Sequence, residues 1–183
     1  MGFKNFILLL FFIILISCSK NSTEPEIIPT SGKVTLTSEI IGIQASGFSF
    51  PLAKIITISN SQGILPDLLV LVHQGGGEIL GVFFSSVDIT PTFSLIAEKS
   101  TPDSSRTIFD GLKEIPVTTF FEGLAIPVRE NQIWAIKTRE NKYAKILILE
   151  TMAFLDSTNS AGPTPLGEAT FDWIFQPNGS RQF

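Results

Sequence analysis

The sequence predicts an all-β fold, a mostly antiparallel sheet domain with one short helix, and three observations support this. Short runs rich in β-branched and aromatic residues recur along the chain, and clusters of Gly, Pro, Asn and Asp separate them. The last run alternates, with Phe171, Trp173 and Phe175 on one face of the expected strand. One segment, residues 103–113, has helical periodicity instead.

The expected strands are separated by recognisable turns. They cover residues 33–44, 48–50, 54–59, 68–73, 79–85, 93–97, 132–138, 143–150 and 169–176. The polar residues 139–142 have the length of a hairpin turn, so the two strands that flank them should pair in the core sheet. A triple glycine at 75–77 lacks the Lys-Ser/Thr of a phosphate-binding loop, and it is interpreted as a turn.

The helix has start and stop signals. Thr101 can cap its first turn, Pro102 suits the first helical position, and Asp103 favours the helix dipole. Its apolar face would consist of Ile108, Phe109 and Leu112. Pro116 then ends helical structure, and the stretch to Pro127 is expected to be a long connection, extended in part.

The amino terminus has the features of a bacterial secretory signal. Lys4 precedes an apolar run, residues 6–16, that is too short for the roughly 17–25 residues of a membrane-spanning helix. The sequence Leu-Ile-Ser-Cys at 15–18 resembles the lipobox of bacterial lipoproteins, and Cys18 is the only cysteine of the chain. We therefore expect residues 1–17 to be a signal peptide that is removed and Cys18 to be acylated, which would hold the protein on its membrane.

The rest of the chain divides into a tether and one domain. Residues 18–31 are polar and contain Pro25 and Pro29, which is typical of a linker, and residues 32–183 form the expected all-β domain. Acylation of Cys18 would leave no disulfide, so packing alone would hold the fold. The formal net charge of −4 argues against nucleic acid as a partner.

Three stretches resemble the HmuY-like family of bacterial haem-binding lipoproteins. They are residues 133–138 (IWAIKT), residues 142–148 (KYAKILI) and residues 170–180 (TFDWIFQPNGS). The resemblance implies an elongated, mostly antiparallel β-domain on the outer membrane that binds haem and passes it to a TonB-dependent receptor. It also implies two iron ligands, commonly His or Met, from the segment ahead of the IWAIKT strand. In this chain residues 93–132 contain neither residue.

Two side chains elsewhere are the candidates for an axial haem ligand. His73, the only histidine, ends an apolar strand, and its imidazole could bind iron or could simply be hydrogen-bonded at a strand end. Met152, the only methionine after residue 17, could be a soft ligand, although a strand methionine is more often packed in a core. We expect haem to bind weakly or through one axial ligand, with His73 the stronger candidate.

The sequence favours a binding protein over an enzyme, because its single histidine has no recognisable nucleophile or carboxylate partner. The predicted function is an outer-membrane, lipid-anchored, non-catalytic protein that binds haem or another apolar small molecule. The alternative is a structural or adhesive surface lipoprotein with a protein partner and no small ligand.

Overall fold

A computed structural model describes residues 28–41, 44–59, 63–158 and 162–183. Within these ranges the chain forms antiparallel sheets and one short helix, so the predicted fold class is confirmed. The elements are β1 (Ser31–Thr37), β2 (Ile40–Ile41), β3 (Gln44–Ser49), β4 (Lys54–Thr57), β5 (Leu69–Gly75), β6 (Glu78–Ser85), β7 (Phe93–Glu98), α2 (Pro102–Gly111), β8 (Leu124–Val128), β9 (Gln132–Lys137), β10 (Tyr143–Asp156) and β11 (Thr164–Gln176). The predicted signal peptide, Cys18 and most of the tether lie outside the described residues.

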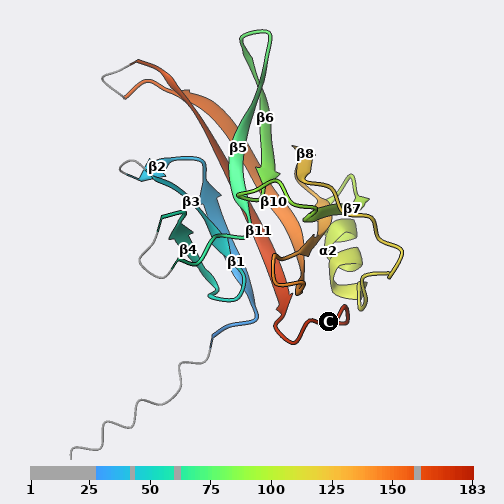
Figure 1. Ribbon diagram of the computed structural model, residues 1–183. Coiled ribbons are helices and arrows are strands. Elements are labelled where there is room, and N and C mark those ends of the chain that lie inside the picture. The colour runs from blue at the N-terminus through green and yellow to red at the C-terminus, as the bar shows by residue number, and fades with distance from the viewer. Residues whose placement is uncertain (1–27, 42–43, 60–62, 159–161) are drawn as a thin grey trace, which may run out of the picture.

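The largest sheet has five strands in the order β1-β11-β10-β9-β7 (Figure 1). Its centre is the β10–β11 hairpin, whose strands pair from Tyr143 with Gln176 to Asp156 with Thr164. The alternation predicted for β11 is confirmed, because Phe171, Trp173 and Phe175 are all buried on one face. That face is the inner face of the sheet.

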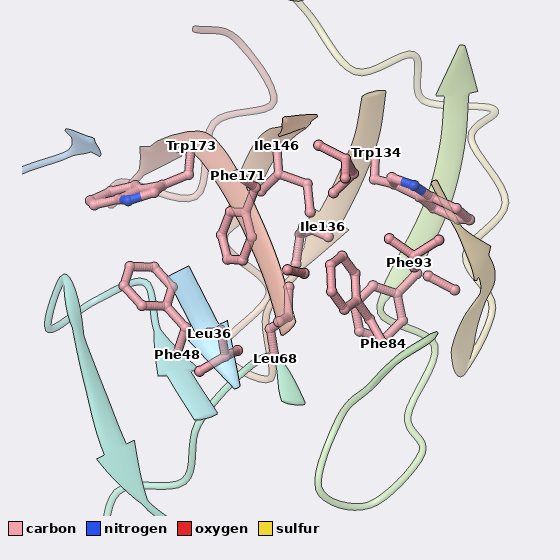
Figure 2. Close-up of a cluster of buried hydrophobic side chains, with 14 of the residues drawn as sticks. Leu36, Phe48, Leu68, Phe84, Phe93, Trp134, Ile136, Ile146, Phe171 and Trp173 are labelled. Carbon is pink, nitrogen blue, oxygen red and sulfur yellow. The ribbon is translucent and has the colours of Figure 1, made fainter. Parts of the chain in front are cut away.

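Two three-stranded sheets, β2-β3-β4 and β5-β6-β8, form the second layer of the sandwich. Phe48 and Phe50 of the β3 region pack against the aromatic row of β11, with 5.3 Å between the ring centres of Phe48 and Trp173. Figure 2 shows Trp173 and Phe48 at one end of the resulting core cluster and Trp134 and Phe93 at the other. The core is continuous between them.

Two hairpins extend beyond this core at the same end of the molecule (Figure 1). One is β5–β6, whose turn contains Gly76 and Gly77 with positive φ angles of 61° and 87°, as the predicted glycine turn requires. The other is the outer half of β10–β11, where Leu155 is exposed. Leu80, near the β5–β6 turn, is exposed as well.

Helix α2 covers part of the outer face of the five-stranded sheet. Thr101 is its N-cap and accepts a hydrogen bond from the Ser104 amide, as predicted. Phe109 packs on Ile133 and Leu147 of the sheet. At the other end of the helix, the Lys145 ammonium donates hydrogen bonds to the carbonyl oxygens of Phe109 and Leu112 at 2.6 and 2.7 Å.

Three sequence predictions need correction. The strand expected at 33–44 is interrupted at residues 38–39, because the Thr37 hydroxyl accepts the Glu39 amide and the chain crosses to the second layer. Part of the connection expected between Pro116 and Pro127 is strand β8, which pairs with β6. The strands β10 and β11 are longer than predicted, because they continue into the projecting hairpin. Among the described residues, no helix is long and apolar enough to cross a membrane.

Candidate functional site

A hollow of about 280 Å³ opens beside the edge strand β7, and we call it the β7–β8 hollow. Three of its walls are large apolar side chains that face solvent: Leu95 is 45% exposed, Phe120 is 77% exposed and Ile126 is 43% exposed. The full lining is Phe93, Ser94, Leu95, Phe120, Glu122, Ile126 and Trp134. Apolar side chains that converge in this way on one concave surface are typical of a binding site.

The floor of the hollow is rigid. Phe93 and Trp134 both belong to the main core cluster and are almost completely buried. The indole N–H of Trp134 donates to the Gln132 side-chain oxygen at 3.0 Å, and that oxygen also accepts the Arg129 amide at 2.9 Å. These bonds fix the orientation of the indole, so the floor is formed before any ligand arrives.

Backbone pairing holds the wall that carries Phe120. Glu122 and Phe93 exchange two hydrogen bonds, with N···O distances of 2.7 and 2.9 Å, and this pins the connection 117–123 against β7. Phe120 therefore stands over the hollow, whereas Val117 of the same connection is 78% exposed and is not among the lining residues. Polar atoms, including those of Ser94 and the exposed Glu122, make up more of the accessible lining than apolar atoms do.

The structure places His73 on strand β5, opposite Gly81 of β6, with its ring at the edge of Phe83 at 6.4 Å. The neighbouring Val72 points at Gly167 of β11, where an added Cβ would lie 3.2 Å from the valine methyl group. Because side chains alternate along a strand, His73 points away from the five-stranded sheet.

Met152 lies on the opposite face of the molecule. It pairs with Glu168, the neighbour of Gly167, so its side chain points away from β5 and β6. It is 47% exposed and not packed in the core, and it lines a shallow depression with Thr35, Glu150, Glu168 and Thr170. His73 and Met152 are therefore separated by both layers of the sandwich, and neither lines the β7–β8 hollow.

Sequence reasoning missed the residues of the hollow. Ile126 lay in a stretch expected to be a connection, and Leu95 in a strand whose edge position was not predictable. One signal was available: the adjacent pair Phe120 and Phe121 interrupts an otherwise polar, turn-rich segment. Phe121 is buried and Phe120 is exposed, so a single aromatic of that pair was sufficient for packing.

Comparisons with known proteins give a weak structural similarity. No family model and no curated protein matches the sequence. Among solved structures, the apo HmuY analog (TFO) of Tannerella forsythia is similar, with 13% sequence identity and a TM-score of 0.37. The match covers 84% of this chain and 100% of that chain. No group of three or more His, Cys, Asp or Glu that could hold a metal ion occurs among residues 28–41, 44–59, 63–158 and 162–183.

Proposed function

We propose that this chain is a lipid-anchored, non-catalytic binding protein of the HmuY-like kind, and that it takes an apolar ligand in the β7–β8 hollow. The observation that carries the proposal is the convergence of Leu95, Phe120 and Ile126 on one concave surface over a floor of buried aromatic rings. A ligand that covers these side chains would gain about 25 cal/mol of binding free energy for each Å² of apolar area removed from water.

The dimensions of the hollow define the ligand further. A volume of about 280 Å³ is at the lower limit of small-molecule sites, so the hollow suits a compact apolar molecule or one edge of a flat one such as haem. The exposed ring of Phe120 and the indole of Trp134 supply flat surfaces for stacking. Since no lining residue is His, Met, Cys or Tyr, haem in this site would not acquire two axial ligands from the lining.

The anchor and the cellular location complete the proposal. Acylation of Cys18 would tie the domain to the outer membrane through the tether, where a TonB-dependent receptor could collect a released ligand. We expect Cys18→Ser to abolish the partition of the full chain into detergent phase, with no acyl mass on the mature amino terminus. Equal partition of variant and wild type would contradict the anchor.

Indole fluorescence, to which Trp134 and Trp173 both contribute, tests the ligand site. Titration of the protein from Ser19 onward with 1-N-phenylnaphthylamine, and separately with haemin, should give saturable quenching of indole emission. Phe120→Ser should weaken binding about tenfold, because it removes the most exposed wall of the hollow. Val117→Ser is the matched control, since Val117 is equally exposed on the same connection but does not line the hollow.

Two results would contradict the proposal. One is the absence of saturable quenching by either probe, and the other is equal weakening by Phe120→Ser and Val117→Ser. For haemin we expect a Soret band without the sharp low-spin form, and His73→Ala and Met152→Ala should each change it little. A low-spin spectrum lost in His73→Ala would move the haem site away from the hollow.

The alternative function is adhesion to a protein partner, and the projecting hairpins favour it. Leu80 of β6 and Leu155 of β10 are each more than half exposed near the tips of these hairpins. In this case neither probe would bind, and joint replacement of both leucines by Ser would abolish association with the partner without lowering the unfolding midpoint. Saturable probe binding that depends on Phe120 would favour the ligand-binding function instead.

A further inference from the structure

A second and larger cavity, of about 450 Å³, lies between the end of strand β3, the segment 63–67 and the turn between β9 and β10. We call it the Asp67 cavity. Its lining is Ser49, Pro51, Leu52, Gly63, Ile64, Leu65, Asp67, Arg139, Glu140 and Lys142. Apolar side chains thus make up one part of the wall, and ionisable groups make up the rest. Figure 2 places Phe48, the neighbour of Ser49, at the opposite end of the core from Phe93 and Trp134, so this cavity is separate from the β7–β8 hollow.

Ser49 is a buried polar residue with an unmade hydrogen bond. It is 1% exposed, and its hydroxyl has no hydrogen-bond partner among the described residues. Phe48 points into the core, whereas a Cβ added at Gly47 would meet Pro66 and Leu69. Alternation along β3 therefore turns Ser49 toward the 63–67 side, where the cavity lies. The Ser46 hydroxyl of the same strand also lacks a partner, so what distinguishes Ser49 is its place in the lining of the cavity.

Asp67 is fixed at the cavity wall by its backbone. Its amide donates to the Phe48 carbonyl at 2.9 Å, and one carboxylate oxygen accepts the Phe50 amide at 3.0 Å. Burial raises the pKa of this carboxyl to about 6, although the Phe50 hydrogen bond acts in the opposite direction. The side chain is thus ionised at pH 7, and of its roughly four acceptor positions the Phe50 amide occupies one.

The cations at the cavity rim already have partners. Arg139 pairs with Asp88 at 2.7 Å, and Lys142 pairs with Glu140 at 2.7 Å. Asp67 has no ion pair with any described residue. Arg139 and Lys142 favour the charged form of Asp67, and Glu140 disfavours it. With Asp88 counted, three negative groups face two positive ones, so the group that would balance the remaining charge is a cation that donates hydrogen bonds.

We propose that the Asp67 cavity binds a small molecule with an ammonium or similar cationic N–H head and a short apolar body. The head donates hydrogen bonds to the free carboxylate oxygen of Asp67 and to the Ser49 hydroxyl. The body lies against Leu52, Ile64 and Leu65. This site is independent of the proposed apolar ligand in the β7–β8 hollow, because the two share no lining residue.

Three probes of equal chain length test this ligand class: hexylammonium, 1-hexanol and hexanoate. We expect hexylammonium to give saturable amide shifts at Ser49, Asp67 and Lys142 in two-dimensional NMR, with a Kd of about 1 mM or below. Hexanol should bind about tenfold more weakly, and hexanoate should not saturate, because neither supplies a charged donor. Hexanoate that binds as tightly as hexylammonium would overturn the proposal.

Matched variants separate binding from folding. Asp67→Asn keeps an acceptor for the Phe50 amide, and it should weaken hexylammonium binding at least about tenfold. Ser49→Ala should weaken it a few-fold, whereas Ser46→Ala should not, because Ser46 is an equally unsatisfied serine of β3 that does not line the cavity. Equal effects of the two serine variants would contradict the site, as would unchanged affinity in Asp67→Asn.

The dependence of affinity on pH gives a further readout. The ionisable groups around the cavity are Asp67, Arg139, Glu140 and Lys142, with Asp88 on the far side of Arg139. Burial raises the pKa of Asp67 to about 6, so hexylammonium affinity should fall as the pH is lowered through 6. In Asp67→Asn this fall should disappear, and a fall that persists in the variant would overturn the role of Asp67.

Discussion

Lys145 is a buried ionisable residue and Asp67 is a half-buried one, and they differ in how completely their hydrogen bonds are made. Lys145 is 2% exposed, and its ammonium donates to two carbonyl oxygens at the end of α2. The ammonium nitrogen lies 4.8 Å from the ring centre of Phe109 and 5.1 Å from that of Phe183. Asp67 accepts one amide and forms no ion pair with the described residues. The hydroxyl of the nearby Ser49 makes no hydrogen bond to them.

This difference distinguishes a structural charge from one suited to a ligand. Lys145 satisfies carbonyl groups that a helix end leaves without partners, so its charge supports the position of α2 on the sheet. Burial lowers the pKa of Lys145 to about 8 and raises that of Asp67 to about 6, so both charges are disfavoured by their surroundings. Lys145 donates two hydrogen bonds, whereas Asp67 accepts one from the Phe50 amide. Unmade polar contacts at Asp67 and Ser49 are the pattern expected of a binding site.

The largest expected effect tests the core that supports Ser49. Trp173 is 4% exposed and packs against Phe48 and Phe50, the residues on either side of Ser49. Trp173→Ala should lower the free energy of unfolding by about 3–5 kcal/mol, because it empties a large aromatic site. Urea denaturation measures this value. A midpoint that hardly moves would mean that this end of the core is loose, and the unmade bond of Ser49 would then reflect poor packing.

The next effect concerns the satisfied charge. Lys145→Ala should lower the free energy of unfolding by about 3 kcal/mol at pH 7.5, because it removes the packed side-chain stem and leaves two buried carbonyl groups unpaired. Lys113→Ala is the control, since Lys113 donates to the carbonyl of Asp110 from an exposed position. That variant should change the free energy by less than about 0.5 kcal/mol. Equal effects would contradict a special role for Lys145.

The same pair of variants has a pH signature. The pKa of Lys145 is lowered from 10.5 to about 8 in the folded state, so between these values the unfolded chain binds the additional proton. Stability contributed by this residue therefore rises as the pH increases from 8 to 10.5. The difference between wild type and Lys145→Ala should grow across this window. In Lys113→Ala the rise in stability should be smaller than in wild type, because the Lys113 charge is one of the causes of the lowered pKa of Lys145.

For the replacement of Asp67 we expect the free energy of unfolding to change in the opposite direction. A folded-state pKa raised from 3.8 to about 6 corresponds to about 3 kcal/mol of destabilisation when Asp67 is ionised. Asp67→Asn should therefore raise the free energy of unfolding at pH 7.5, by about 1–2 kcal/mol once the new amide N–H₂ is left without a partner. Between pH 3.8 and 6 the folded state of the wild type binds more protons at Asp67 than the unfolded state does. The free energy of unfolding of the wild type should therefore fall as the pH rises from 3.8 to 6, and that of Asp67→Asn should fall less. A destabilised variant would contradict this view of Asp67.

The smallest effect is at the hydroxyl. Ser49→Ala removes a buried group that has no partner, so it should leave the protein as stable as wild type or more stable by up to about 1 kcal/mol. Ser46→Ala should have the same effect on the free energy of unfolding as Ser49→Ala. Unlike Ser49→Ala, it should leave hexylammonium binding unchanged. A loss of more than about 1 kcal/mol in Ser49→Ala would indicate that the hydroxyl has a structural hydrogen bond.

The sequence was sufficient for the parts of the fold that depend on local pattern. The alternation of Phe171, Trp173 and Phe175 identified the core face of β11, and Thr101 with Pro102 located the start of α2 to within a residue. Strand β8 was not predictable as a strand, since Pro127 within it suggests a connection and its pairing partner β6 is about 40 residues away.

The sites depend on tertiary contacts that local pattern does not contain. Asp67 follows a proline in what resembles a turn, and the residues opposite it, 139–142, look like an ordinary solvated hairpin turn. Only the packing of the two layers brings these segments to one cavity. The same packing separates His73 and Met152, which the sequence offered as haem ligands, onto opposite faces of the molecule.

The claim that Asp67 is a half-buried charge suited to a ligand can be tested most directly by measuring its pKa. Carboxyl carbon NMR of the protein from Ser19 onward should give a pKa near 6 for Asp67 in the free protein. At saturating hexylammonium the value should fall toward or below the ordinary value of 3.8, because a cation beside a carboxylate favours its charged form. A pKa that is ordinary in the free protein, or unchanged by hexylammonium, would contradict the account.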